Sequence, residues 1–356
     1  MSHPYIGLPA RQYWRTGVAE SHPFTVEDLY HKKFEIRAED RIATAGSCFA
    51  QHVSTHMKRR GYNIIDVEPP APGMTDATAK KYGYSIYSGR FGNIYTARQL
   101  VQLMRDCERG KVRDEDIWEK DGRFYDGLRP GVEPAGLSSA EEVRLQRKDH
   151  LARVKAMFST LDVMIFTLGL TEGWVNVQTG TTYPTCPGVM AGTFDPQAYA
   201  FKNFTHAEIL EDLKFARDFI KKRNANARIL FTVSPVPLTA TAVDEHILSA
   251  TTYSKSVLRA VAGQMAQDFA DVDYFPSYEM IASPFSRGFF YEPNMRSVTT
   301  VGVETVMKVF FSQHRLADEH GEAKSGPRKG GGKRARRAAN DADDVVCEEK
   351  LLEAFS

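Results

Sequence analysis

The stretch Ile42-Ala-Thr-Ala-Gly-Ser-Cys-Phe-Ala50 joins a short apolar run to a segment with helical periodicity. Residues 42–45 have the length and apolar character of a buried strand. Phe49, Val53 and Met57 recur every four residues, which predicts a helix with one buried stripe that ends at Gly61. Because residues 62–67 have the pattern of a second strand, residues 42–67 predict one βαβ unit.

Ser47 lies on the turn from this first strand into its helix. The hydroxyl is therefore expected at the carboxyl edge of the sheet, close to helix N–H groups that favour negative charge. Acyl-transfer chemistry needs a nucleophile in such a place. The alternative is an ordinary Gly-Ser turn in which Ser47 only caps the next helix.

The same alternation of strand and helix continues along the chain. Further strands are expected at residues 161–168, 228–233 and 272–275, and helices follow Thr96, the capping box Thr205-x-x-Glu208, Val257 and Val303. The near-continuous apolar character of residues 161–168 is typical of a strand covered on both faces. The chain is therefore predicted to be an α/β protein with a doubly wound parallel sheet of about five strands and helices on both faces.

The periodicity also divides the chain into segments. We expect an N-terminal extension over residues 1–39 and one domain over residues 40–316, with an inserted lobe or long loop at about 107–150. Residues 317–356 lack periodicity and pass from a Gly-rich basic cluster into an acidic stretch, which predicts a disordered charged tail.

Composition restricts the partners. The 46 basic residues nearly balance the 45 acidic ones, and a net charge of +1 gives no overall field for nucleic acid or an anionic membrane. The four cysteines are far apart without CxxC spacing, so neither a zinc site nor a disulfide framework is predicted. No apolar stretch reaches the length of a membrane span, and we expect a cytoplasmic protein without metal or cofactor.

Six segments of the chain together resemble the signature blocks of the GSCFA-domain family. They are Gly46-Ser-Cys-Phe-Ala50, Phe91-Gly-Asn-Ile-Tyr-Thr96, Thr167-Leu-Gly-Leu-Thr-Glu172, Ser234-Pro-Val-Pro237, Tyr253-Ser-Lys-Ser256 and Tyr274-Phe-Pro-Ser-Tyr-Glu279. The resemblance covers roughly residues 40–312. The family is in turn similar to the SGNH/GDSL hydrolases, which implies a flavodoxin-like sheet and ester or acyl-transfer chemistry, often on carbohydrate substrates.

The resemblance also implies roles for individual residues. Ser47 would be the nucleophile, with its own backbone N–H as one donor to the oxyanion. Gly92, Asn93 and Gly169 match blocks in which such hydrolases place further oxyanion donors. Thr171 and Glu172 stand where the related hydrolases have an asparagine, so this part of the pattern is matched incompletely.

A larger departure concerns the general base. Where the SGNH pattern has Asp-x-x-His, this chain has Asn294-Met-Arg-Ser297, and neither Asn294 nor Ser297 can accept the nucleophile's proton near neutral pH. One hypothesis is that His246 moves over Ser47 as a substitute base, oriented by Glu172 or Asp244.

The other hypothesis is a catalytically degenerate carbohydrate-binding or scaffold protein on the same fold. Asn93, Glu172, Trp174, Asn294 and Arg296 would then hold a polar ligand, with Trp174 either stacked on a sugar or packed in the core. Arg296 and Arg129 could clamp an anionic group or form ion pairs at the surface. Cys48 ranks below Ser47 as a nucleophile, and the His52/His56 pair has no third metal ligand nearby in the sequence.

From the sequence we therefore expect an SGNH-like serine esterase or acyltransferase that acts on an O-acylated saccharide through a Ser47 acyl-enzyme. Its partner would be a small-molecule or saccharide substrate. Hydrolysis and acyl transfer share the same covalent intermediate, so the sequence does not choose between them. The oligomeric state stays open.

Overall fold

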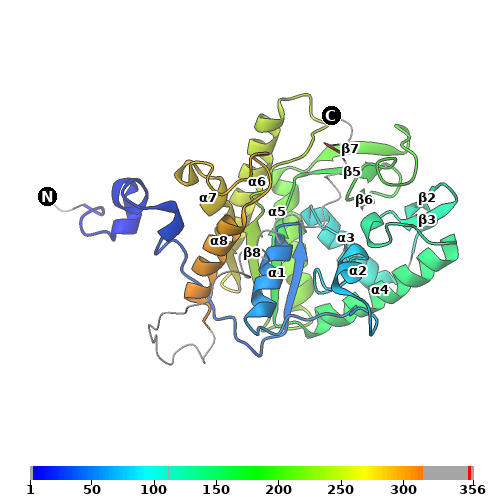
Figure 1. Ribbon diagram of the computed structural model, residues 1–356, viewed down its shortest axis with the longest axis horizontal. Helices are drawn as coiled ribbons and strands as arrows, with labels where there is room; N and C mark the ends of the chain where they lie inside the picture. Colours follow the sequence, from blue (N-terminus) through cyan, green and yellow to red (C-terminus); the bar gives the residue numbers. More distant parts are fainter. Residues whose placement is uncertain (1–2, 111, 316–351, 354–356) are drawn as a thin grey trace, which may run out of the picture.

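The computed structural model describes residues 3–110, 112–315 and 352–353. The charged tail expected over residues 317–356, with its basic cluster, lies outside the described residues except for Leu352 and Glu353. The chain forms layers of helices around a central sheet, with the N-terminal segment projecting to one side (Figure 1).

The central sheet contains four parallel strands in the order β1-β4-β8-β9. They are β1 (Ile42–Gly46), β4 (Val163–Leu168), β8 (Arg228–Val233) and β9 (Val272–Phe275). Every residue of β1, β4 and β9 is buried. The prediction of an α/β fold with a doubly wound parallel sheet is confirmed, and the strands occur close to where the apolar runs placed them.

Helices cover both faces of this sheet (Figure 1). One core holds Met164 and Phe166 of β4, and the other holds Val163 and Ile165, as expected when alternate side chains point to opposite faces. On the first side lie α3 (Ala97–Arg109), α4 (Ala140–Thr160), α5 (His206–Lys221) and α6 (Ile247–Asp268), and on the second side lie α1 (Ala50–Arg59), α7 (Ser277–Ala282) and α8 (Thr300–Gln313).

The expected second strand at residues 62–67 is reduced to a single parallel bridge between Ile64 and Ile42. Ser88 takes the neighbouring edge groups of β1, because its Oγ accepts from the Thr44 N–H at 2.9 Å and its own N–H donates to the Thr44 carbonyl. With the bridge included, the strand order matches the flavodoxin-like order 2-1-3-4-5. The point where this order reverses therefore lies between β1 and β4.

Several smaller elements surround the carboxyl end of the sheet. The segment that was expected to be inserted contains the antiparallel hairpin of β2 (Ile117–Lys120) and β3 (Arg123–Asp126), followed by the first half of α4. A three-stranded antiparallel sheet, which the sequence patterns did not indicate, has the order β6-β5-β7. Its strands are β5 (Glu172–Asn176), β6 (Thr182–Tyr183) and β7 (Tyr199–Asn203), and α2 (Asp76–Lys81) lies in the connection after α1.

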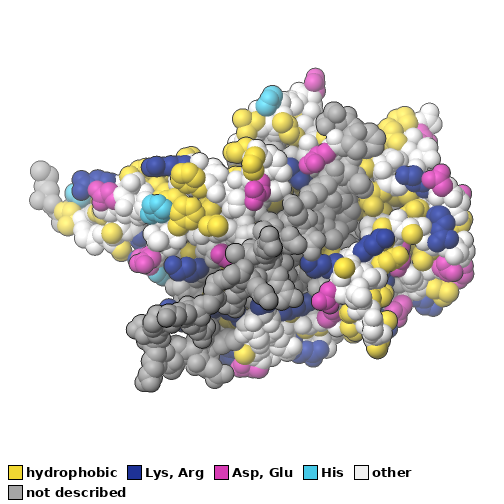
Figure 2. Space-filling view, in the orientation of Figure 1, with side chains coloured by type: hydrophobic (Ala, Val, Ile, Leu, Met, Phe, Trp, Pro, Cys, Tyr) yellow, Lys and Arg dark blue, Asp and Glu magenta, His cyan; other side chains and the backbone are white. Residues whose placement is uncertain are grey.

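Short helical turns complete the described chain: Ala10–Gln12, Arg15–Ala19, Pro23–Thr25, Asp114–Asp116, Pro130–Val132 and Pro284–Ser286. Among the described residues, no helix has the length and apolar character needed to cross a membrane. Basic and acidic side chains are interspersed on the face that Figure 2 shows, in line with the balanced composition.

Candidate functional site

Ser47 follows β1 directly, at the point where the strand order reverses. Gly46 before it has φ +134°, and a Cβ atom there would lie only 2.4 Å from the Thr167 carbonyl oxygen, so only glycine allows β1 to end so close to β4. The Ser47 carbonyl accepts from the Ala50 N–H at 2.9 Å as the chain turns into α1. Open α/β sheets place their ligands at this kind of edge.

The Ser47 hydroxyl is buried and has no hydrogen-bond partner among the described residues. It does not cap α1, whose N-cap residue is Phe49 and which has no side-chain cap bond. The simple capping role considered for Ser47 is therefore wrong. The hydroxyls of Thr44, Ser54, Thr167 and Thr171 are likewise buried without a partner among the described residues, so the feature that distinguishes Ser47 is its position at the carboxyl edge of the sheet.

Gly169, after β4, packs directly against Ser47. A Cβ atom on Gly169 would lie 2.8 Å from the Ser47 Cβ and 3.0 Å from the Tyr95 carbonyl oxygen. The Gly169 N–H donates to that Tyr95 oxygen at 3.1 Å, and the Ser47 N–H donates to the Thr167 carbonyl at 3.1 Å. Two of the N–H groups in the segments that the resemblance implied as oxyanion donors, those of Ser47 and Gly169, are thus engaged by backbone carbonyls in this structure.

Asn93 reaches the site on the loop of residues 88–94. The Ile94 N–H donates to the Gly46 carbonyl at 2.9 Å, and Gly92 adopts a positive φ of 67° in the turn before Asn93. The buried Asn93 Oδ1 accepts from Tyr87 Oη at 2.5 Å, while the same Tyr87 hydroxyl lies 3.1 Å from the Ser47 carbonyl oxygen. Since the amide is held through its oxygen, its nitrogen is the side of Asn93 that serves as a donor.

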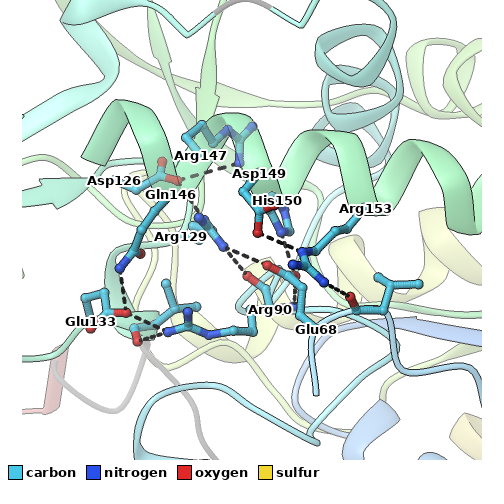
Figure 3. A network of polar contacts seen from close by, with 12 residues as sticks. Glu68, Arg90, Asp126, Arg129, Glu133, Gln146, Arg147, Asp149, His150 and Arg153 are labelled. Carbon is cyan, nitrogen blue, oxygen red and sulfur yellow. Dashed lines mark hydrogen bonds and ion pairs between the residues drawn. The ribbon is translucent and has the colours of Figure 1, made fainter. Parts of the chain in front are cut away.

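A buried network of charged residues holds the loop of residues 88–94 from behind (Figure 3). Glu68 Oε2 accepts from the Arg90 N–H at 2.6 Å and pairs with His150 Nδ1 at 2.7 Å. Arg129 Nη1 donates to the Arg90 carbonyl at 3.1 Å, and its Nε pairs with Asp126 at 2.7 Å. The backbone of Arg90 is therefore held on both sides, which fixes the approach to Asn93.

The same network settles the surroundings of Arg129. The sequence left two alternatives for Arg129, a clamp for an anionic ligand and an ion pair at the surface. The side chain is 1% exposed and pairs with Asp126 in the interior, so neither alternative describes it. Arg147, also buried, links the network to Asp106 at 3.2 Å. These charges connect the segment before α4 to the loop beside β1, and we interpret them as structural.

The protonation states in the network follow from its geometry. Burial, with a contribution from the Arg129 charge, lowers the pKa of His150 to about 4. Burial alone would raise the pKa of Glu68, but the His150 hydrogen bond and the Arg129 charge outweigh it and lower that pKa to about 2. Near neutral pH, Glu68 is therefore ionised and accepts a hydrogen bond from the Nδ1–H group of a neutral His150.

His246 and Glu172, the expected substitute base and its orienting carboxylate, are not paired with each other or with the Ser47 hydroxyl. His246 is exposed and caps α6, with its Nδ1 accepting from the Leu248 N–H at 3.2 Å. Glu172 instead accepts from Thr241 Oγ1 at 2.8 Å, and burial raises the pKa of its carboxyl group. Asp244 is exposed on the same loop.

Asn294 and Ser297, at the expected Asp and His positions, bond to each other in an exposed turn. Asn294 Oδ1 accepts from the N–H groups of Arg296 and Ser297, both at 2.9 Å, and Asn294 Nδ2 donates to Ser297 Oγ at 3.0 Å. Arg296 lies 3.9 Å from Glu353. This segment therefore presents a self-contained turn in place of a base and its orienter.

Trp174 and Thr171 differ in their environments. Trp174 is half-buried and packs edge-on against Phe194 and Phe201, with ring centroids 5.3 Å and 5.8 Å away, outside the buried core clusters. Thr171 is completely buried, and its Oγ1 has no partner within the described part of the chain. Its N–H donates to Ser254 Oγ of α6 at 3.1 Å.

Lys255 is the residue at the site that our sequence reasoning missed. It is 1% exposed, and its Nζ donates at 2.7 Å to the Gly169 carbonyl. One signal was available, because Lys255 lies three and seven residues before Leu258 and Ala262, on the side of the helix that carries apolar residues. Ionisable residues are rarely buried completely without a functional or pairing reason.

No set of three or more His, Cys, Asp or Glu residues in the described ranges is arranged to hold a metal ion. Cys48 is buried beside Ser47. The groups brought together at the site are therefore hydroxyl, amide, backbone and ammonium groups.

The comparisons with known proteins identify one family. A model of the GSCFA family matches residues 41–310, which is well over half of the chain. No curated protein and no solved structure matches the chain.

Proposed function

Because this chain belongs to the GSCFA family, we propose that it is a serine esterase or acyltransferase of the SGNH type with Ser47 as nucleophile. The observation that carries the proposal is the buried, unpartnered Ser47 hydroxyl at the point where the strand order reverses. Open α/β sheets bind their ligands at this edge, and acyl transfer needs a hydroxyl that is not engaged by a protein group there.

In this proposal, Ser47 Oγ attacks the carbonyl carbon of an ester. A bond forms between Oγ and that carbon, the ester C–O bond breaks, and the Oγ proton ends on the departing alcohol. The oxyanion formed on the way would be stabilised by the Asn93 amide and by the N-terminus of α1, which begins three residues after Ser47. Water or an acceptor hydroxyl then releases the acyl group.

The substrate class we propose is an O-acylated saccharide. Support for it comes from the family resemblance and from the polar side chains near the site, such as Asn93 and the Glu172–Thr241 pair. Amide and carboxylate groups recognise hydroxyl-rich ligands by hydrogen bonding. A cytoplasmic location stays a prediction.

A second candidate function is saccharide binding without catalysis at the same site. It is favoured by one observation: no described carboxylate, imidazole or amine hydrogen-bonds to the Ser47 hydroxyl. The exposed Asn294 turn and the capping role of His246 point the same way. The hydroxyl would then bond to a sugar rather than attack it.

Labelling with a fluorophosphonate probe tests the choice between the two functions. We expect covalent labelling of the wild-type chain between about pH 6 and about pH 9, a range that includes histidine titration, and loss of the label in Ser47→Ala. Ser54→Ala is the matched control, because Ser54 is also buried with an unpartnered hydroxyl and lies on α1. Absence of labelling across that range, with saccharide binding retained, would replace the enzyme proposal with the binding one.

A further inference from the structure

Lys255 places a buried amino group on the carbonyl of Gly169, the residue that packs against the candidate nucleophile. Its side chain extends from α6, is 1% exposed, and donates from Nζ to the Gly169 carbonyl at 2.7 Å. This N···O separation lies in the range of charge-assisted hydrogen bonds. The contact fixes the position of Lys255 Nζ against the Gly169 carbonyl.

Gly169 connects Lys255 to Ser47. The carbonyl of Gly169 accepts from Lys255, and the Gly169 Cα lies so close to Ser47 that an added Cβ would approach the Ser47 Cβ to 2.8 Å. Ser254, the residue before Lys255, accepts from the Thr171 N–H at 3.1 Å. Two consecutive residues of α6 thus hold the turn that packs on Ser47.

We propose that Lys255 is a positioning residue that supplies the positive charge for the Ser47 site. Its ammonium group fixes the Gly169 carbonyl, and its field stabilises the negative charge that develops on the Ser47 oxygen and on the acyl oxyanion. A charge in a buried, water-poor site acts more strongly than one at the surface. Lys255 keeps its protons throughout, so no proton transfer is assigned to it.

This role rests on the proposed function, since it concerns the reaction at Ser47. It also gives a function to the block Tyr253-Ser-Lys-Ser256, which the sequence singled out and which the serine chemistry alone does not use. The charge would partly compensate for the Ser47 and Gly169 N–H groups, which are already engaged by backbone carbonyls.

The test compares fluorophosphonate labelling rates of Ser47 in the wild-type chain, Lys255→Met and Lys255→Arg. We expect Lys255→Met to label about 100-fold more slowly at neutral pH, because removal of one preorganised electrostatic group typically has an effect of about that size. Lys255→Arg keeps the charge and should stay within about tenfold of the wild type on the same reasoning. In Lys255→Met, the pH of half-maximal labelling should move upward, which a merely structural role would not cause.

Lys33→Met is the matched control. Lys33 also donates to backbone carbonyls, those of Phe269 and Val272 among them, but at the opposite end of α6 from the site. Its labelling rate and pH profile should equal those of the wild type. Far-UV circular dichroism and thermal unfolding show whether each variant is folded.

The outcomes separate this inference from the proposed function. If the wild type labels at Ser47 and Lys255→Met labels equally fast, the inference is overturned while the proposed function stands. If Lys255→Arg is as slow as Lys255→Met although folded, charge is not the property that matters, and the inference is again overturned. If the wild type does not label at all, both fail. Should Lys255→Met not fold, the Lys255→Arg pH profile decides, since a profile unlike the wild type's contradicts the proposal.

Discussion

Two neighbouring regions at the end of β1 bury polar groups in opposite ways. Behind the loop of residues 88–94, Glu68, Arg129 and Asp126 are ionised and each is paired with an opposite charge or a backbone group. In front of it, the hydroxyls of Ser47 and Thr171 are buried without a partner among the described residues. The first region holds the fold together through its paired charges, whereas the second places unpaired hydroxyls near the carboxyl edge of the sheet.

The difference has an energetic basis. A buried charge that loses its partner destabilises the fold strongly, so the network cannot be left incomplete. An unpaired hydroxyl costs much less, and a protein can carry that cost at a site that a substrate completes. The network also holds the Arg90 backbone. The charged region therefore positions the loop that carries Asn93 next to the region around Ser47.

The largest effect is expected from breaking the network at Arg129. Arg129→Met leaves Asp126 and Glu68 buried with less compensating charge, and we expect it to lower the free energy of unfolding by about 3–5 kcal/mol. Urea denaturation measures this. Arg153→Met is the control, because the Arg153–Asp149 pair is about half exposed and should contribute no more than about 1 kcal/mol. Equal stabilities of the two variants would contradict the structural role of the network.

The next effect is a dependence of stability on pH. Because the pKa of His150 is lowered from 6.5 to about 4, the unfolded chain binds a proton in this window that the folded protein does not. Stability should therefore fall as the pH drops from about 6.5 to about 4, by up to about 1.4 kcal/mol per pH unit from this group. Protonation of Glu68 reduces the stability further only at lower pH, between the usual pKa of 4.5 and its lowered pKa of about 2.

His150→Gln checks this assignment. The variant should be less stable at neutral pH. The slope of its free energy of unfolding against pH between about 4 and about 6.5 should be smaller, by up to about 1.4 kcal/mol per pH unit, which corresponds to one bound proton. Unfolding curves at a series of pH values measure the slope. An unchanged slope would mean that His150 does not titrate as described.

Gly169→Ala sharpens the comparison from the side of the site. The new methyl group would press on the Ser47 Cβ and the Tyr95 carbonyl, so we expect a loss of about 1–3 kcal/mol in stability together with reduced labelling of Ser47. Gly173→Ala is the control, because its nearest neighbour is a Thr182 methyl at 3.1 Å and it lies away from Ser47 on β5. Normal labelling of Gly169→Ala would show that the close packing does not position the nucleophile.

The smallest effect concerns the unpaired hydroxyl itself. Ser47→Ala removes no hydrogen bond of its side chain and also removes a buried unpaired oxygen, so stability should stay unchanged or rise by up to about 1 kcal/mol. Ser277→Ala, in contrast, removes a buried hydroxyl that bonds to Thr232 at 2.6 Å and to the Val233 carbonyl at 3.0 Å, and should cost about 1–3 kcal/mol. Thermal unfolding of both variants tests the difference, and a Ser47→Ala loss as large as that of Ser277→Ala would show that Ser47 has a structural partner after all.

Much of the fold could be predicted from local patterns. The runs that become β1, β4, β8 and β9 were recognisable because each is short and apolar. The helix starts at Thr96 and Thr205 were also recognisable, and both form the capping boxes that such residues favour. The second strand was predicted too long, because Ser88, distant in sequence, competes for the same edge of β1.

The site was predictable only in part. Ser47 and Gly169 pack together because they follow neighbouring strands of a parallel sheet, and Tyr87 links Ser47 to Asn93. The pairing of His246 with Glu172 could not be checked from spacing, because it depends on which turn each loop adopts, and one of them caps a helix while the other bonds to Thr241. The sequence also could not show that backbone carbonyls accept from the N–H groups of Ser47 and Gly169.

By itself, the sequence determined the layered α/β architecture and the place of Ser47 on it, because periodicity and turn residues act over a few neighbouring positions. Only the tertiary structure decided which polar groups are paired. Arg129 becomes a buried structural charge, Lys255 reaches Gly169, and the Ser47 hydroxyl is left without a partner among the described residues. Each of these outcomes joins segments far apart in the chain, and burial, which sets the energy of every such contact, exists only once the whole domain has packed.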